Sequence, residues 1–105
     1  MKASIAASAV LLPLALTGAT CYAAGGQATG TITLYNLNGT IQNRGACVQM
    51  NPAVPNGWAC IWRNNLLYPE ISLMLLEARM QGKQCSLGWS TTDGSGYAMI
   101  DWAQC

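Results

Sequence analysis

Four cysteines remain in this chain once its N-terminal segment is set aside, and they constrain the fold more than any other feature. They are Cys47, Cys60, Cys85 and Cys105. A domain of about 80 residues buries a limited core, and secreted domains of this size commonly add disulfides. A zinc site is the alternative, but the sequence has no C-x-x-C pair and no histidine. We therefore expect two disulfides, with three pairings open at this point.

Residues 1–23 have the organisation of a secretory signal peptide. Lys2 supplies a positive start, and the stretch from Ile5 to Leu16 is mostly apolar. Cys21-Tyr22-Ala23 then places small residues at the two positions that signal peptidase recognises. We expect cleavage after Ala23 and a single domain over residues 24–105.

Two alternatives to secretion fit the N-terminal segment less well. A membrane anchor would need a longer apolar stretch to span the hydrocarbon core of a bilayer. Lipidation of Cys21 would need a different residue from Thr20 before it. We therefore predict a secreted or periplasmic protein with no membrane span.

Charge and residue types exclude several classes of function. Without Lys2, four cations balance four anions, so the domain has no basic surface for nucleic acid or an anionic membrane. The absence of histidine removes the commonest general base and leaves the serines without an activating partner. No paired carboxylates or phosphate-binding glycine loop appear. We expect a non-catalytic protein without a metal, a cofactor or a nucleic-acid partner.

Hydrophobic periodicity and turn residues predict a mainly β domain with one helix. The helix begins near Pro69, with Glu70 at its positive end, and stops at Gly82. The expected order is β-β-β-α-β-β, which is the arrangement of a five-stranded OB-fold-like barrel. The expected strands are Gly30–Leu37, Ile41–Met50, Ala59–Trp62, Lys83–Trp89 and Tyr97–Trp102, and the helix is Pro69–Gln81.

The predicted helix has two apolar faces. One carries Ile71, Met74, Leu75 and Ala78, and the nearly opposite one carries Leu73, Leu76 and Met80, at about 100° per residue. A small monomer needs only one buried helix face, so a neighbouring subunit could cover the second. The alternative is that these are ordinary surface side chains. We favour an oligomer interface.

Seven large aromatic side chains follow residue 24, and they favour a binding function. Trp102, within Met99-Ile100-Asp101-Trp102, is expected to belong to the core. Trp58 and Trp89 lie beside stretches rich in glycine, serine or threonine, and we expect them to be partly exposed. Stacking of single-stranded nucleic acid would also need a basic groove, which this composition does not supply.

Several landmarks share their spacing with a known family. They are Thr29-Gly30 followed by Gly39, Ile41, Asn43 and Cys47; Ala46-Cys47-Val48 and Ala59-Cys60 around a loop; Leu75 and Ala78 on the helix; Gly82-Lys83-Gln84 at its end; and Trp89. Over most of residues 29–90 the chain resembles the B subunits of pertussis-like bacterial toxins, of the subtilase-cytotoxin and typhoid-toxin type.

The resemblance implies a secreted OB-fold subunit that forms a ring, a pentamer in the family, and binds host surface glycans, including sialylated ones. It also leaves room for a catalytic A subunit as partner. Thr29 stands where the family has a serine that contacts sialic acid, and Trp89 where it has a tyrosine. Gln49 is the loosest match, to a polar contact after the first disulfide cysteine. Helices lining a pore would account for the face with Leu73, Leu76 and Met80.

The resemblance also bears on the disulfides. The family's disulfide-linked strand pair implies a Cys47–Cys60 bond. The region after Trp89 departs from the family, whose C-terminal cysteines lie close together, and the chain is shorter. The remaining pair, Cys85–Cys105, is predicted to link the fourth strand to the C-terminus.

Overall fold

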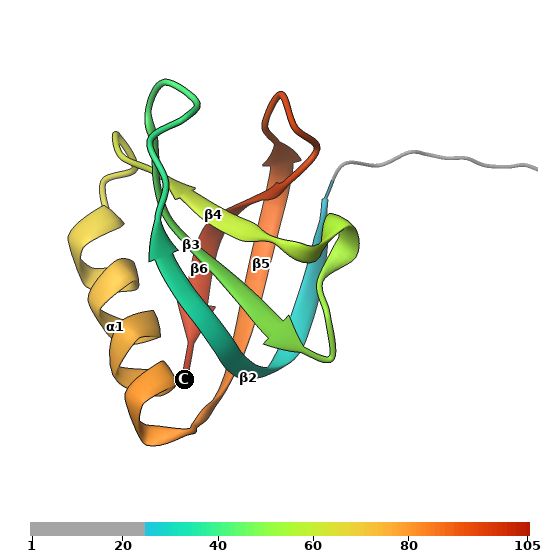
Figure 1. Ribbon diagram of the computed structural model, residues 1–105, viewed down its shortest axis with the longest axis vertical. Helices are drawn as coiled ribbons and strands as arrows, with labels where there is room; N and C mark the ends of the chain where they lie inside the picture. Colours follow the sequence, from blue (N-terminus) through green and yellow to red (C-terminus); the bar gives the residue numbers. More distant parts are fainter. Residues whose placement is uncertain (1–24) are drawn as a thin grey trace, which may run out of the picture.

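The computed structural model describes residues 25–105, so the signal peptide predicted over residues 1–23 lies outside the described residues. Within them, five strands and one α-helix make up the fold (Figure 1). They are β2 (Gly26–Leu37), β3 (Arg44–Asn51), β4 (Ala59–Trp62), α1 (Tyr68–Gln81), β5 (Gln84–Thr92) and β6 (Ala98–Gln104), with the short 3₁₀ turn η3 (Pro55–Gly57) before β4. None of the helices in this described part is long and apolar enough to cross a membrane.

The strands close into a barrel in the order β2-β3-β4-β6-β5, and β5 returns to pair with β2. Every neighbouring pair is antiparallel except β4 and β6, which run parallel. The long strand β2 is shared, because Gly26–Thr31 pairs with β5 and Thr31–Leu37 pairs with β3. The elements follow the predicted order β-β-β-α-β-β, and the predicted fold class, a five-stranded OB-fold-like barrel, is confirmed.

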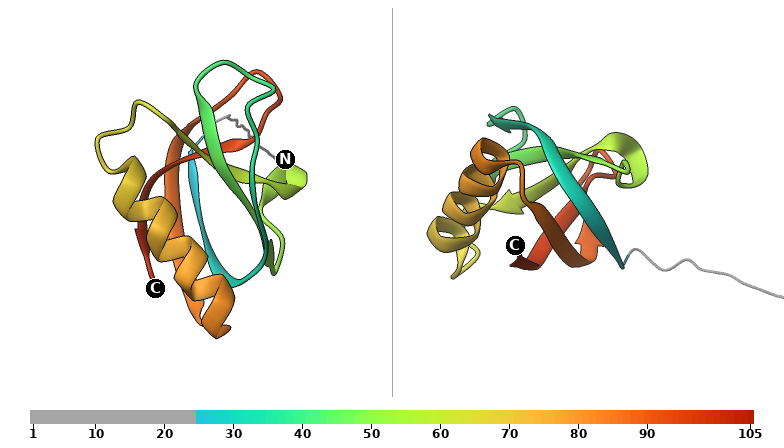
Figure 2. Two further views of the ribbon diagram at one scale, coloured as in Figure 1. Left: turned by 60° about the vertical axis from the view of Figure 1, so that its left-hand side comes forward. Right: turned by 90° about the horizontal axis from the view of Figure 1, so that it is seen from below.

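The helix α1 lies along one side of the barrel (Figure 2). Pro69 stands in its first turn, and Gly82 ends it with a left-handed φ of 67°, a conformation that glycine adopts without steric cost. Ile71, Leu75 and Ala78 are buried against the strands, as predicted. Met74 is only half-buried, so that face is narrower than the sequence indicated.

Two disulfides tie the barrel together, and both predicted pairings are confirmed. Cys47 and Cys60 are register partners on β3 and β4. Cys85 on β5 is bonded to Cys105, which directly follows β6. The first bond lies in a buried cluster with Met99, against which Trp58, Trp62 and Tyr97 pack.

Three strand boundaries differ from the prediction by three residues or more. β2 begins at Gly26 rather than Gly30, since β5 supplies partners for the small residues before Gly30. β3 begins at Arg44 rather than Ile41, because a turn through Asn43, at φ 72°, precedes it. β5 continues beyond Trp89 to Thr92.

The predicted exposures of two tryptophans are wrong. Trp89 is 8% exposed and belongs to the core, whereas Trp102 is 40% exposed. The β5–β6 register shifts twice, leaving Asp101 and then Ser90 without a direct partner across the ladder. The two extra residues are joined by the Ser90 hydroxyl, which donates to Asp101 Oδ2 at 2.7 Å. A bulge of this kind turns the following side chain to the other face of a sheet, so Trp102 points outward although Ile100 points inward.

Candidate functional site

A cleft of about 310 Å³ lies where β2 begins, between η3 and the end of β5. Trp89 of β5 supplies its aromatic wall, and Ala98 of β6 adds a small apolar contact. The residues that add polar groups to its lining are Gln27, Asn56 and Thr92. The cleft therefore combines one indole with amide and hydroxyl side chains.

Close packing of β2 on β5 forms this cleft. Gly26 is the register partner of Trp89, and a Cβ added at Gly26 would come within 2.9 Å of indole Cζ2. Contacts that close are essentially absent for real Cβ atoms, so glycine is required here for the strand to approach the ring. The position of Trp89 is thus fixed by the backbone of β2.

The opposite side of the cleft is held by a contact between two loops. Asn56 of η3 has a φ of 59°, and its side-chain Nδ2 donates to the Gly96 carbonyl at 2.8 Å. This bond connects η3 to the turn between β5 and β6. Asparagine tolerates the left-handed region better than other non-glycine residues, which suits it to this position.

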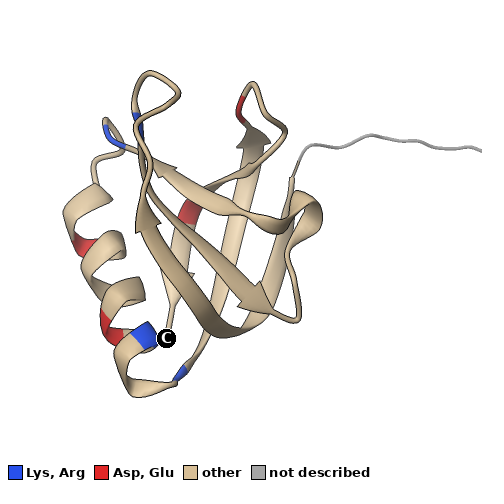
Figure 3. Ribbon diagram, in the orientation of Figure 1, with Lys and Arg blue, Asp and Glu red and all other residues tan. Residues whose placement is uncertain are grey.

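Within residues 25–105, none of the side chains that line this cleft carries a charge. Figure 3 places the charged residues on α1, in loops, at the start of β3, just before β5 and on β6, away from η3 and the first half of β2. A pocket with an aromatic wall and a few neutral polar groups suits a ligand with apolar patches and hydroxyl groups.

The structure does not bring Thr29, Gln49 and Trp89 together in one pocket. Trp89 lines the cleft. Thr29 lies further along β2 on the outer face of the barrel, where its hydroxyl is 2.8 Å from the Ser86 hydroxyl. Gln49 lies on β3 opposite Leu34, and is only half-buried.

Sequence reasoning missed the partners of these residues. Ser86 is the register partner of Thr29 on β5, and Asn56 and Gln27 line the cleft with Trp89. The alternation along Gly26–Thr31 could have indicated that Gln27 and Thr29 share a face. The contact of Asn56 had no signal in the sequence, because it depends on a loop 40 residues away.

The three predicted interface residues on α1 differ in how far they are exposed. Leu73 is 56% exposed and Met80 is 76% exposed, whereas Leu76 is half-buried. The second apolar face of the helix is therefore open in the single chain. A neighbouring surface would find two large apolar side chains here.

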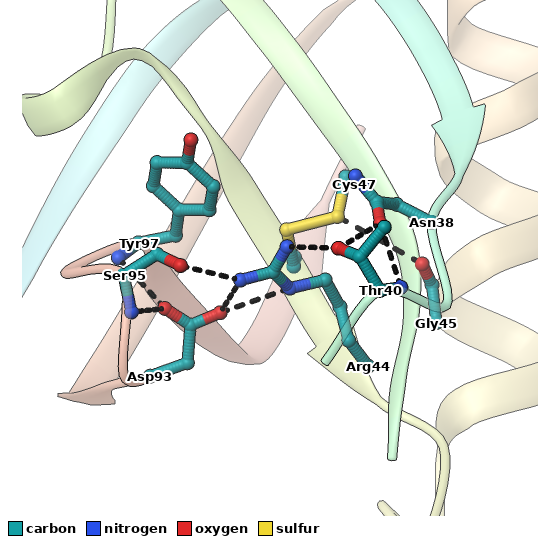
Figure 4. The surroundings of a disulfide bond; sticks show 9 residues. Asn38, Thr40, Arg44, Gly45, Cys47, Asp93, Ser95 and Tyr97 are labelled. Carbon is teal, nitrogen blue, oxygen red and sulfur yellow. Dashed lines mark hydrogen bonds and ion pairs between the residues drawn. A yellow bond between two sulfur atoms is a disulfide. The ribbon is translucent and has the colours of Figure 1, made fainter. Parts of the chain in front are cut away.

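A buried ion pair holds the turn between β5 and β6 to the start of β3 (Figure 4). Arg44 is 3% exposed, and its Nε donates to Asp93 Oδ2 at 3.0 Å while Nη2 donates to the same oxygen. Nη2 also donates to the Ser95 hydroxyl at 3.1 Å, and the guanidinium carbon lies 5.0 Å from the centre of the Tyr97 ring. These contacts indicate that the ion pair stabilises the fold.

Asp93 is satisfied on both of its carboxylate oxygens. Its Oδ1 accepts hydrogen bonds from the backbone N–H groups of Ser95, at 2.8 Å, and Tyr97, at 3.1 Å. Burial raises the pKa of the Asp93 carboxyl, but the hydrogen bonds and the charge of Arg44 outweigh burial and hold that pKa below its ordinary value. The carboxylate is therefore the preferred form in the folded protein.

Comparisons of the chain with protein-family models, with curated proteins and with solved structures find no match. In residues 25–105, no three His, Cys, Asp or Glu side chains gather in a way that could hold a metal ion.

Proposed function

We propose that this chain is a secreted, non-catalytic carbohydrate-binding subunit that assembles as a ring, like the B subunits of pertussis-like bacterial toxins. The observation that carries this proposal is the cleft beside Trp89, with an indole wall and neutral polar lining. The predicted signal peptide and the two disulfides support an extracytoplasmic location. A catalytic A subunit would be the partner that the resemblance implies.

A sugar fits this cleft better than other ligand classes do. Pyranose rings have an apolar face that packs on an indole, and their hydroxyl groups both donate and accept hydrogen bonds, as do Gln27, Asn56 and Thr92. Four cations and four anions in the domain leave no basic groove for nucleic acid. The aromatic wall is rigid, so little conformational entropy is lost when a ligand packs on it.

Glycan binding is expected to depend on Trp89 and, less strongly, on Thr29. Trp89→Ala should weaken binding at least about tenfold, which corresponds to about 1.4 kcal/mol of lost interaction. Thr29→Ala removes one hydroxyl and should weaken binding by about threefold to tenfold. The measurement is a glycan array that includes sialylated and neutral glycans, probed with the oxidised protein and followed by titration of the best ligand.

Because Trp89 is buried, each variant is first checked for a native circular dichroism spectrum and a native melting transition. Trp62→Ala is the matched control, since it truncates a half-buried tryptophan that lines a different pocket with Gln42 and Arg63. Full binding by Trp89→Ala and Thr29→Ala would contradict the assignment of these residues. An array without any bound glycan would contradict the proposed function.

Ring assembly is expected to depend on the open face of α1. Leu73→Glu replaces one of the two exposed apolar side chains of this face with a charge, so burial against another subunit would carry a desolvation penalty. We expect native mass spectrometry to show a discrete oligomer for the wild type and a folded monomer for Leu73→Glu. Leu66→Glu, at an exposed leucine outside α1, is the control that should leave the oligomer intact.

A second candidate function rests on the same helix face. The chain could be a small disulfide-stabilised domain that self-assembles or binds a protein through Leu73 and Met80, without a toxin role or a sugar ligand. An oligomer that is lost in Leu73→Glu, together with an empty glycan array, would favour this function. A wild-type monomer would remove the ring from both candidates.

A further inference from the structure

We infer that the outer face of β2, β5 and β6 around Trp102 is a second carbohydrate subsite, which takes a neutral pyranose ring. This inference rests on the proposed function and extends its site from the cleft to the side of the barrel. The ligand would then be an oligosaccharide of at least two sugar residues. In this subsite the sugar would pack on Trp102, which is 40% exposed, whereas in the cleft it would pack on Trp89, which is 8% exposed.

Strand register places two rows of side chains side by side on this face. Gln27, Gly88 and Trp102 are aligned across β2, β5 and β6. Two residues further along β2 and β6, the second row consists of Thr29, Ser86 and Gln104. Residues two apart in a strand project to the same side, so the rows form one continuous surface.

The Trp102 indole is held in a defined position on this surface. A Cβ added at Gly88 would overlap the indole Nε1 and Cε2 atoms, so the ring occupies the space where a side chain on β5 would stand. The bulge at Asp101 turns Trp102 to the outside, and 40% of the residue stays exposed. The ring is thus a preformed platform, and little side-chain entropy is lost when a ligand packs on it.

Neutral hydrogen-bonding groups border the platform. The hydroxyl oxygens of Thr29 and Ser86 are 2.8 Å apart, and each retains capacity for a further hydrogen bond to a ligand. The exposed side chains of Gln27, on β2 in the first row, and Gln104, on β6 in the second row, add amide donors and acceptors. This combination matches the apolar face and the equatorial hydroxyl groups of a sugar.

Charge on this face disfavours an acidic sugar. The two rows carry no charged residue, and the carboxylate of Asp101 directly precedes Trp102 and accepts the hydrogen bond from Ser90. The closest cation along the chain is Lys83, which precedes β5 and lines a pocket with Gln104 at the far end of the second row, whereas Asp101 is the direct neighbour of Trp102. A carboxylate or sulfate on a ring stacked at Trp102 would lie closer to the Asp101 carboxylate than to Lys83, so a neutral ring is the expected occupant there.

The platform and the cleft are continuous through Gln27. Gln27 lines the cleft, and it is also aligned with Gly88, over which the indole lies. Gly26, the partner of Trp89, precedes Gln27 and projects to the inner face, so Gln27 lies at the start of β2 where the inner cleft meets the outer face. One oligosaccharide can therefore contact the cleft with one ring and Trp102 with the next.

The test uses the full oxidised chain and matched glycan pairs. Lactose, lacto-N-tetraose and 3′-sialyllactose are titrated with the wild type, alongside an array of neutral glycans and their sialylated counterparts. We expect neutral glycans to bind more tightly than their sialylated counterparts, and tetrasaccharides more tightly than disaccharides. Trp102→Ala should lower tetrasaccharide affinity at least about tenfold and disaccharide affinity less.

Gln104→Ala provides a milder second variant, because it changes an exposed side chain and leaves the platform in place. It should weaken tetrasaccharide binding by about threefold to tenfold. Unchanged binding by both variants, with binding lost in Trp89→Ala, would overturn the second subsite and leave the proposed function standing. Preference for sialylated glycans would also overturn it. A change of oligomeric state in Trp102→Ala without a change in sugar binding would make this face an interface between copies.

Discussion

Asp93→Asn is expected to lower the free energy of unfolding by about 3 kcal/mol, because it leaves the buried Arg44 guanidinium without a counter-charge. Both side chains are excluded from solvent, and Arg44 makes two of its hydrogen bonds to Asp93 Oδ2. The asparagine oxygen can still accept the backbone hydrogen bonds of Ser95 and Tyr97, so the turn keeps its local geometry. The amide nitrogen then faces the Arg44 N–H donors and cannot accept from them, so the variant loses both the counter-charge and the two hydrogen bonds to Oδ2.

Urea unfolding and thermal melting with the disulfides intact measure this effect. In a domain of this size each kcal/mol lowers Tm by about 4–8 °C. Asp101→Asn is the matched control, since the same substitution at an exposed carboxylate should change stability by about 0.5 kcal/mol or less. A loss for Asp93→Asn no larger than that of the control would contradict the stabilising role of the ion pair.

The same pair gives stability a dependence on acid. The folded protein holds the pKa of Asp93 below its ordinary value, so the unfolded state binds a proton first as the pH falls. The contribution of the carboxylate is complete above about pH 4, the ordinary range of an aspartate, and is lost as the pH falls through the lowered pKa. The stability difference between wild type and Asp93→Asn should be constant near neutrality and shrink in acid.

Removal of the Cys47–Cys60 disulfide by paired alanine substitution is expected to cost about 3 kcal/mol or more. The bond closes a loop with a sequence separation of 13, which restricts the unfolded chain by about that amount. Both cysteines are also buried, at 2% and 0% exposure, so the substitution leaves space in the core. Urea unfolding of the wild type and the double variant measures the difference.

The paired substitution of Cys85 and Cys105 serves as the comparison. Its loop has a sequence separation of 20, so the entropic contribution is nearly the same. Cys105 is exposed beyond the end of β6, so little core volume is lost on that side. We expect a smaller destabilisation than for Cys47 and Cys60, and a larger one would contradict the importance of the buried cluster.

Local signals were sufficient for the parts of the fold that depend on neighbouring residues. Pro69, Glu70 and Gly82 located the helix to within one residue, because caps and turn residues act over a few positions. The short strand Ala59–Trp62 was predicted with its observed bounds. The resemblance supplied the Cys47–Cys60 pairing, which the residues alone left among three possibilities.

The candidate site was less predictable because it depends on register between distant strands. A period of two places Ile100 and Trp102 on one face, and only the bulge at Asp101 separates them. No residue type near Asp101 specifies a bulge by itself. Thr29 was identified through the resemblance, but its neighbour Ser86 lies 57 residues away and becomes a partner only in the closed barrel.

The division of β2 between two partners has a consequence for the kinetics of folding. Its second half can form a hairpin with β3 as soon as that strand is available, which is a local and therefore fast event. Its first half can pair only with β5, which lies far along the chain. Closing the long loop between these two strands carries a large entropic cost before any contact compensates for it. Barrel closure is therefore the late step, and the cleft beside Trp89 forms only when it is complete.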